Sequence, residues 1–252
     1  MGIDKIAIKG HVILKDQTWS QNGKLNQCLN IITSKNGGGK TSLLRYINEE
    51  CDNNENNIVR FISTSISSFR SSLYLNEYRQ HSLRGIRPVI YREYSPEYKF
   101  ISELYDREER GEKLLDDCNK FLKSLSVNIQ LESYMINAGR LRFINTQNNA
   151  KLSIDEISTG EKTAFILWLI TKSEPKPNVL LLDEFDSSIG HNIVYDFYNK
   201  LLDFSQQYKI QIFIATHRIT NQTLPTTDKF TKWIIENGSI VMDPSHEAES
   251  DN

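Results

Sequence analysis

Apolar residues recur along the chain with two periods, and these periods separate the expected strands from the expected helices. Alternating or continuous apolar runs predict strands at residues 3–11, 25–33, 58–64, 127–131, 141–144, 179–182 and 210–216. Apolar spacings of three and four residues predict helices after residue 40, within 98–122, over 163–171 and around 194–201. The closing segment 233–242 predicts a hairpin that turns on Asn237 and Gly238. We therefore expect an α/β fold with a mixed core sheet and flanking helices.

A segment in the middle of the chain interrupts this alternation of strands and helices. Ser95 and Pro96 favour a helix start there, because Ser can cap free N–H groups and Pro suits the first helical turn. Residues 66–126 are expected to form a mainly helical arm inserted into a core made of residues 1–65 and 127–244. The acidic residues 245–252 are expected to be a disordered tail.

Length, charge and cysteine content limit the class of protein. The chain has 252 residues, of which 38% are hydrophobic and 25% charged, and this composition is typical of a globular protein with a full core. Lys and Arg number 30 against 32 Asp and Glu, so bulk charge indicates no nucleic-acid partner, although a local basic patch is compatible with this balance. The three cysteines are widely separated and predict neither a disulfide framework nor a zinc site.

The hydrophobic runs also bear on location. None approaches the roughly 18 apolar residues that indicate a membrane-spanning helix. The first ten residues alternate like a strand and lack the continuous apolar region of a signal peptide. We expect a cytoplasmic protein with no direct insertion into a membrane.

The motif SKNGGGKTS at residues 34–42 lies between an expected strand and an expected helix. Glycines allow backbone N–H groups to surround a phosphate, and the N-terminus of the following helix adds its dipole. In such a loop Lys40 reaches the β- and γ-phosphates of ATP and Thr41 holds Mg²⁺. Ser34 stands where the usual pattern has glycine, and the alternative is a glycine-rich turn beside a surface lysine. The candidate nucleotide-binding residues are Ser34, Asn36, Gly37, Gly38, Gly39, Lys40, Thr41 and Ser42.

A second motif, VLLLDE at residues 179–184, is a continuous apolar run that ends in two acidic residues. The apolar run is typical of a parallel strand buried on both faces. At its end Asp183 is a candidate for the Mg²⁺ shell, and Glu184 is a candidate to orient or deprotonate the attacking water. A strand that ends in acidic residues only because it meets solvent is the alternative. Together, the two motifs predict nucleotide hydrolysis.

The order of motifs resembles that of ABC-type ATPase heads. NGGGKT matches their phosphate-binding loop, and STGEK at residues 158–162 matches their signature motif, with Gly160 lying 23 residues before Asp183. This resemblance implies that Ser158, Gly160 and Glu161 contribute to the nucleotide site of a partner subunit. It also implies that His217, 33 residues after Glu184, is a switch histidine that senses the γ-phosphate.

Each of these features also has a structural explanation. Ser158 and Glu161 have the spacing of a capping box at the start of a helix. His217 at a strand end is more often a structural or surface histidine. Gln80 lies 40 residues after Lys40, near the position where the resemblance implies a glutamine that contacts Mg²⁺. Arg70 is a candidate phosphate or DNA contact, and a solvated surface arginine is the more frequent case.

Variant residues narrow the resemblance to one branch of these ATPases. Only 118 residues separate Lys40 from Ser158, which excludes the long coiled coils of structural-maintenance heads. Transporter subunits carry a different signature, and Gly190 replaces the last aspartate of their DEPTSALD-like run. They also stack an aromatic residue on adenine, whereas Trp19 is more typical of a core residue. The variant motifs resemble the ATPases of overcoming-lysogenisation-defect nucleases and RecF-like proteins.

This resemblance implies an ATPase that uses ATP and Mg²⁺ and forms a head-to-tail homodimer, or a higher homo-oligomer, when ATP is bound. Because no effector motif is recognisable, we expect it to regulate a separate effector chain in defence against phage or other invading DNA. Two alternatives stay open. One is the ATPase subunit of an ABC transporter, and the other is a RecF-like DNA-repair ATPase, for which nucleic acid would be a partner.

The lysine of the glycine-rich loop provides a direct test of the nucleotide site. Lys40→Ala removes the cation that would bind the β- and γ-phosphates, so we expect ATP turnover to fall by about 100-fold or more. A steady-state phosphate-release assay measures this loss. Unchanged hydrolysis in the variant would contradict the assignment of the site.

Overall fold

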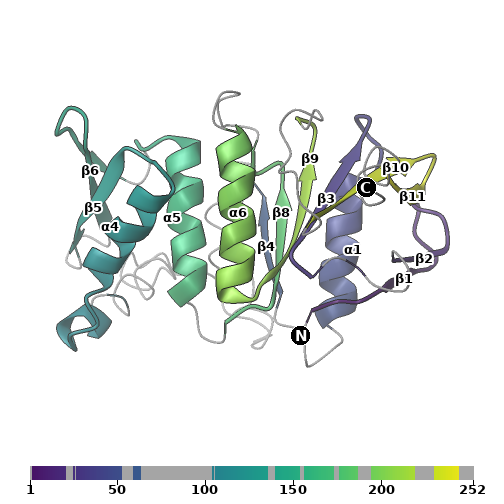
Figure 1. Ribbon diagram of the computed structural model, residues 1–252, viewed down its shortest axis with the longest axis horizontal. Coiled ribbons are helices and arrows are strands. Elements are labelled where there is room, and N and C mark those ends of the chain that lie inside the picture. Colours follow the sequence, from purple (N-terminus) through teal and green to yellow (C-terminus); the bar gives the residue numbers. More distant parts are fainter. Residues whose placement is uncertain are drawn as a thin grey trace, which may run out of the picture. The chain divides into compact units, whose positions relative to one another are not determined.

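The computed structural model describes the residues 2–20, 25, 27–52, 59–63, 104, 106–135, 140–153, 156–172, 176–186, 194–218 and 230–243 (Figure 1). By its internal contacts the chain divides into two compact units. Unit 1 comprises Met1–Phe69 and Thr171–Asn252, and unit 2 comprises Arg70–Ile170. No described helix is both long enough and apolar enough to cross a membrane.

The six-stranded sheet of unit 1 is the mixed core sheet expected from the sequence. Its strands follow the order β11-β10-β3-β9-β8-β4, with β10, β3, β9, β8 and β4 parallel and β11 antiparallel at one edge. Their bounds are β3 Leu29–Ser34, β4 Val59–Ser63, β8 Val179–Asp183, β9 Gln211–Thr216, β10 Phe230–Glu236 and β11 Ser239–Met242. All residues of β8 and β9 are buried, as their continuous apolar sequences require for strands covered on both faces.

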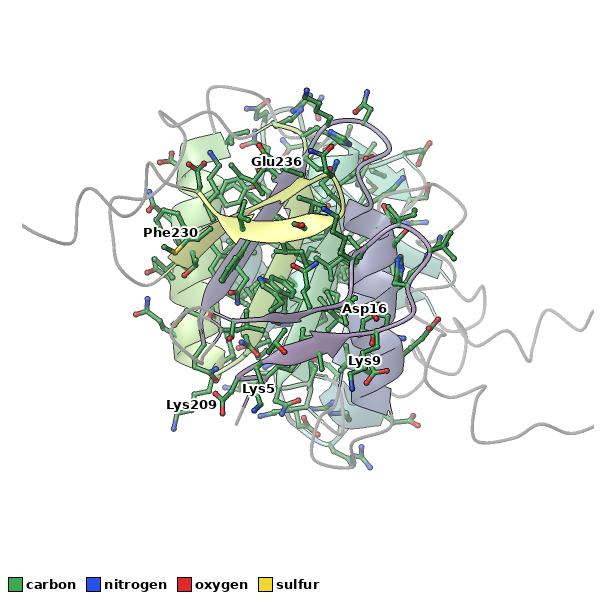
Figure 2. All side chains as sticks on the ribbon, turned by 90° about the vertical axis from the view of Figure 1, so that its right-hand side faces the viewer. Lys5, Lys9, Asp16, Lys209, Phe230 and Glu236 are labelled. Carbon is green, nitrogen blue, oxygen red and sulfur yellow. The ribbon has the colours of Figure 1, made fainter. Side chains whose placement is uncertain are left out.

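Helices cover both faces of this sheet. Helix α1 (Lys40–Asp52) lies on one side and α6 (Val194–Tyr208) on the other, with the parallel strands between them (Figure 2). The apolar residues Leu43, Leu44 and Ile47 of α1 are fully buried against the sheet. Because α1 follows β3 after only five residues, its packing fixes the loop that joins them.

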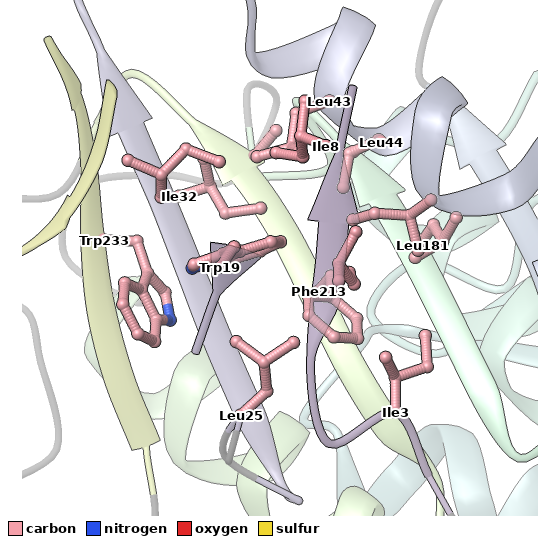
Figure 3. Close-up of a cluster of buried hydrophobic side chains, with 14 of the residues drawn as sticks. Ile3, Ile8, Trp19, Leu25, Ile32, Leu43, Leu44, Leu181, Phe213 and Trp233 are labelled. Atoms are coloured by element: carbon pink, nitrogen blue, oxygen red, sulfur yellow. The ribbon is translucent and has the colours of Figure 1, made fainter. Parts of the chain in front are cut away.

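A short strand pair near the N-terminus completes the core on the α1 side. Strands β1 (Ile6–Ile8) and β2 (Gln17–Trp19) pair in antiparallel register. Trp19 is buried and lies edge-on to Phe213 and Trp233, with ring centroids 5.6 and 5.4 Å apart (Figure 3). Trp19 is therefore a core residue, which is the role that the sequence analysis favoured over stacking on adenine.

The expected strands at residues 3–11 and 25–33 were wrong in extent. The first is only three residues long, because Gly10 adopts φ +63° and its N–H donates to Asp16 Oδ1 at 2.8 Å, which turns the chain back toward β2. Strand β2 was missed because a three-residue strand is too short to show an alternating pattern. The second expected strand begins four residues later, at Leu29.

Unit 2 is a three-stranded antiparallel sheet packed against helices. The sheet has the order β5-β6-β7, and α4 and α5 supply the helices. The bounds are α4 Leu114–Ser124, β5 Ile129–Met135, β6 Arg140–Asn145, β7 Lys151–Ser153 and α5 Thr159–Lys172. Phe143, Phe165 and Trp168 share its buried core, and the Trp168 indole donates to Asp117 Oδ2 at 2.8 Å. Residues 127–170, assigned to the ATPase core from sequence, thus share a hydrophobic core with α4 of the expected arm.

Part of the expected arm is described. Residues 106–109 are helical, the chain turns at Gly111 with φ +91° and Lys113 with φ +48°, and α4 then begins. This break falls in the charged run that interrupts the apolar spacing in the sequence. The remainder of the arm, the turn at 137–139 and the acidic tail 245–252 lie outside the described residues.

Trp19 provides a test of this core. Trp19→Ala removes a buried indole that contacts two other aromatic rings, so we expect the free energy of unfolding to fall by about 3–5 kcal/mol. The neighbouring exposed residue offers a control, since Thr18→Ala on the same strand should change it by less than about 1 kcal/mol. Urea unfolding followed by circular dichroism measures both. Equal effects of the two substitutions would contradict the packing described.

Candidate functional site

Three neighbouring parallel strands of unit 1 end at the same edge of the sheet. Thr33 of β3 lies opposite Thr216 of β9, and Asp183 of β8 lies opposite Ala215 of β9. The residues that follow β3, β8 and β9 therefore emerge side by side. In open α/β sheets this carboxyl edge is where ligands bind.

The loop from β3 to α1 has a backbone that requires glycine. Gly37 and Gly39 adopt φ +76° and +96°, which are strained for other residues. A Cβ on Gly38 would lie 2.6 Å from Ser34 Oγ and 2.9 Å from the Lys35 carbonyl oxygen. The three successive glycines therefore bring backbone amides to the start of α1 with no side chain of their own in front of them. This arrangement is the backbone cradle that a phosphate group needs.

Lys40 extends back across this loop from the first residue of α1. Its ammonium lies 3.2 Å from Ser34 Oγ and 3.1 Å from His217 Nδ1, and its side chain is buried, with 5% of the residue exposed. None of these hydrogen-bond partners is a carboxylate. Burial lowers the pKa of Lys40, while the charges of Glu184 and Asp183 act in the opposite direction. A buried ammonium that contacts no carboxylate of the described residues suits an anionic ligand such as a phosphate.

Ser34 stands where the usual pattern has glycine, and its hydroxyl contacts the Lys40 ammonium. Its hydroxyl donates to the Lys35 carbonyl oxygen at 2.9 Å and accepts from Lys40. The serine in place of glycine thus adds a polar partner for Lys40, and it also makes a hydrogen bond within the loop.

Thr41 and Asp183 form the second part of the site. The Thr41 hydroxyl lies 3.1 and 3.0 Å from the two carboxyl oxygens of Asp183. Burial raises the pKa of Asp183, while the Thr41 hydroxyl bond lowers it. No group of three or more His, Cys, Asp or Glu side chains that could hold a metal ion occurs among the described residues. One carboxylate beside one hydroxyl fits Mg²⁺, which usually keeps several waters and completes its shell with substrate phosphates.

Glu184 and His217 are brought together at the same edge. Glu184 Oε1 lies 3.1 Å from His217 Nε2, and the other ring nitrogen of His217 faces Lys40. Glu184 adopts φ +50°, and its backbone N–H donates to the Ala215 carbonyl oxygen at 2.8 Å. A left-handed conformation in a residue other than glycine is strained and is held here by that bond. The carboxylate side chain is about half exposed, so it is available to solvent and ligand.

Ser158 and Glu161 form the capping box that was the structural alternative for the STGEK motif. The Ser158 N–H donates to Glu161 Oε2 at 2.8 Å, and the Glu161 N–H donates to Ser158 Oγ at 3.3 Å. Helix α5 consequently begins at Thr159, four residues before the start at 163 expected from apolar spacing. Ser158 is exposed, and a Cβ on Gly160 would meet no atom of the described residues within 4 Å. The capping box is compatible with a role of Ser158 and Gly160 in the nucleotide site of a partner subunit, and that role stays a prediction.

The remaining candidates are placed as follows. Asn36 is exposed at the tip of the glycine-rich loop, and Ser42 is half-buried in the first turn of α1. Gln80, Arg70 and Gly190 lie outside the described residues. Sequence reasoning did not single out Asp186, a buried acid whose only signal was a third carboxylate in the DEFD segment.

A mixed core sheet with parallel central strands, a glycine-rich loop between β3 and α1, and Asp183 and Glu184 at the end of the buried strand β8 define a P-loop NTPase with an ABC-ATPase-like fold. Residues 57–219 match the family model described as "AAA domain, putative AbiEii toxin, Type IV TA system". Since this match covers well over half of the chain, the protein belongs to that family of AAA ATPases. No curated protein matches the sequence.

Solved structures show the same fold at low sequence identity. The Smc head bound to the C-winged helix domain of ScpA has a TM-score of 0.59 at 13% identity, covering 96% of this chain and 97% of that one. The SMC head domain from Thermotoga maritima has a TM-score of 0.54 at 12% identity, covering 97% and 99%. The protein cbiO1 from Clostridium perfringens, part of the ABC transporter complex cbiONQ, has a TM-score of 0.52 at 13% identity, covering 99% and 90%.

The raised pKa of Asp183 gives a testable pH dependence. A carboxyl group whose pKa is higher in the folded than in the unfolded chain binds its proton more tightly in the folded chain. Once the group is ionised, above the folded-state pKa, it lowers the free energy of unfolding, and this cost disappears at low pH where the group is protonated in both states. Asp183→Asn removes this cost. We expect the variant without nucleotide to be more stable than the wild type at pH 7, with the difference shrinking toward pH 4.

Thermal unfolding at both pH values measures this difference. The exposed Asp203 of α6 offers a control, since Asp203→Asn should change stability by less than about 0.5 kcal/mol. A wild type that is more stable than Asp183→Asn at pH 7 would contradict the role of burial.

Proposed function

We propose that the protein binds and hydrolyses ATP with Mg²⁺ at the carboxyl edge of the unit 1 sheet. The buried Lys40 carries this proposal, because among the described residues its ammonium contacts no carboxylate and lies beside a glycine-rich backbone cradle. A triphosphate would supply charged acceptor oxygens in direct contact with this ammonium. Thr41 and Asp183 would hold the Mg²⁺, which neutralises charge on the phosphate oxygens when bound.

Glu184 and His217 have complementary roles in this proposal. The half-exposed carboxylate of Glu184 orients the attacking water and accepts its proton. His217 holds that carboxylate through Nε2 while Nδ1 faces Lys40, so one imidazole connects the phosphate-binding lysine with the proton acceptor. A change in the position of Lys40 on binding phosphate is thereby transmitted to Glu184.

The signature residues support a composite site formed by two copies of the chain. Gly160 occupies the first turn of α5, where glycine is less favourable than alanine by roughly 0.5–1 kcal/mol and where the fold leaves open space for a Cβ. The described residues of one chain therefore do not explain this glycine, whereas a close approach by a ligand on a partner would. Two such chains would close head to tail on two ATP molecules, each adding Ser158 and Gly160 to the other's site.

ATP-dependent closure is a switch, because a ligand that binds the closed state more tightly shifts the population toward it. We propose that this switch regulates an effector on a separate chain, in defence against phage or other invading DNA. The family match, whose description refers to a toxin of a toxin–antitoxin system, and the variant motifs STGEK and DEFDSSIG support a regulatory role.

The dimer is tested by trapping the state before hydrolysis. Glu184→Gln should still bind ATP but hydrolyse it slowly, so the closed dimer accumulates. We expect the solution mass of this variant to rise from 29.2 kDa to twice that value on adding ATP and Mg²⁺. Light scattering coupled to size exclusion measures the mass.

A bulky charge at the proposed contact gives the matched comparison. Ser158→Arg added to Glu184→Gln should keep the mass at the monomer value with ATP present. Ser124→Arg, on an exposed position at the end of α4, should leave the ATP-dependent dimer intact. A mass that ignores ATP in Glu184→Gln, while the wild type hydrolyses ATP, would refute the composite site and leave the cap as the role of STGEK.

A further inference from the structure

A buried hydrogen-bond network lies beside the site and involves a residue with no role in the proposal above. Asp186 is only 1% exposed, although aspartate is seldom buried without partners. Its Oδ2 atom accepts hydrogen bonds from the Thr216 hydroxyl at 2.6 Å and from the Tyr198 hydroxyl at 3.0 Å. Thr216 ends β9 and Tyr198 belongs to α6, so one carboxyl oxygen joins three separate parts of unit 1.

Arg218 closes the network on the side of His217. Its guanidinium donates to the Asp186 carbonyl oxygen at 3.2 Å, and its backbone N–H donates to Thr216 Oγ1 at 3.0 Å. Both flanking residues of His217 are therefore tied to Asp186, Thr216 through its hydroxyl and Arg218 through its guanidinium. The segment 216–218 has little freedom to move relative to the segment 183–186.

These two segments carry the two residues that must meet at the site. Glu184 lies two positions before Asp186, and His217 lies between Thr216 and Arg218. The Glu184–His217 contact of 3.1 Å spans the gap between the segments that the network joins. Glu184 is also strained at φ +50°, so it needs surrounding contacts that hold its backbone.

We propose that Asp186 is a positioning residue for ATP hydrolysis, which acts through Thr216 and Tyr198 to hold Glu184 and His217 in register. This inference rests on the proposed ATPase function. Tyr198 keeps its proton throughout the working pH range, because burial and the neighbouring Asp186 raise its pKa well above the usual value. The hydroxyl is thus a permanent donor to Asp186.

The residues that would bind the phosphates make no direct hydrogen bond to the network among the described residues. Lys40, Thr41 and the glycine-rich loop precede the network in the chain, and none of them contacts Asp186, Tyr198 or Thr216 in the hydrogen bonds of the described residues. Loss of the network should therefore lower kcat and leave ATP affinity largely unchanged. A residue that only stabilises the fold would lower the melting temperature without this separation.

Three substitutions weaken the network at its shared acceptor or at one of its two hydroxyl donors. Asp186→Asn keeps the volume and removes the charge, Tyr198→Phe removes one hydroxyl, and Thr216→Val removes the other. We expect kcat to fall by about 10- to 100-fold in Asp186→Asn and Thr216→Val, which is the range typical of residues that orient a catalytic group. The dissociation constant for ATP should stay within about threefold of the wild type. Thr216→Ser retains the hydroxyl and should restore most of the activity.

Ser205→Ala is the matched control. Ser205 lies on α6, two turns after Tyr198, and its buried hydroxyl has no hydrogen-bond partner among the described residues. Removing this hydroxyl changes the same helix without touching the network. Its kcat should equal that of the wild type.

A double-substitution cycle separates positioning from a structural effect. If Asp186 acts through His217 and Glu184, then Asp186→Asn should lower kcat by less than about twofold in a protein that already carries His217→Ala. Full additivity of the two losses would overturn the proposal, as would a wild-type kcat in Asp186→Asn. If Asp186→Asn does not fold, Tyr198→Phe and Thr216→Val give the same test.

The outcome also distinguishes this inference from the proposed function. A wild type without ATPase activity, or a Glu184→Gln variant as active as the wild type, would refute the site itself and the positioning role with it. An active wild type with an inactive Glu184→Gln and a fully active Asp186→Asn would refute the positioning role alone.

Discussion

The parallel pairing of β8, β9 and β3 is the constraint on which the rest of the structure depends. Because parallel strands in register end at one edge, this pairing alone brings Ser34, Asp183 and Thr216 together from three distant parts of the sequence. Buried apolar side chains on both faces hold the strands, and α1 continues from β3 with its apolar side against the same sheet. The phosphate-binding loop is therefore positioned by a rigid base and needs only glycines to follow the path between strand and helix.

The site combines two kinds of unfavourable group that the core keeps in place. Lys40 and Asp183 are buried ionisable side chains, and Glu184 has a strained backbone. Such features persist only where the surrounding structure is stable enough to hold them, and they concentrate at functional sites. The aromatic cluster of Trp19, Phe213 and Trp233 lies in that stabilising core, which explains why a tryptophan upstream of the loop packs inward and does not face a ligand.

Sequence patterns predicted the central strands and the residues that meet at the site, because continuous apolar runs and glycine-rich loops have few other structural interpretations. They failed where an element is too short to show a pattern, where a local cap starts a helix ahead of its apolar residues, and where tertiary contacts decide. The three-residue β2 carries no pattern of its own, and α5 begins early because a capping box forms ahead of the apolar run. The position of Asp186 beneath the site was also inaccessible, since its partners Tyr198 and Thr216 are distant in sequence. Likewise, the association of residues 127–170 with α4 depends on side-chain packing that no local pattern encodes.

The position of β3 in the sheet also determines the order in which the chain can fold. Both neighbours of β3, β9 and β10, come from the last quarter of the sequence, so Leu29 pairs with Ile212 on one side and with Phe230 on the other. During synthesis β3 therefore lacks both partners until β9 and β10 have left the ribosome. Unit 2 is continuous in sequence, and the described residues of its core lie between Leu104 and Leu169, so its contacts are closer in sequence than those of β3. A chain that ends before β9 contains the phosphate-binding loop without either strand that pairs with β3.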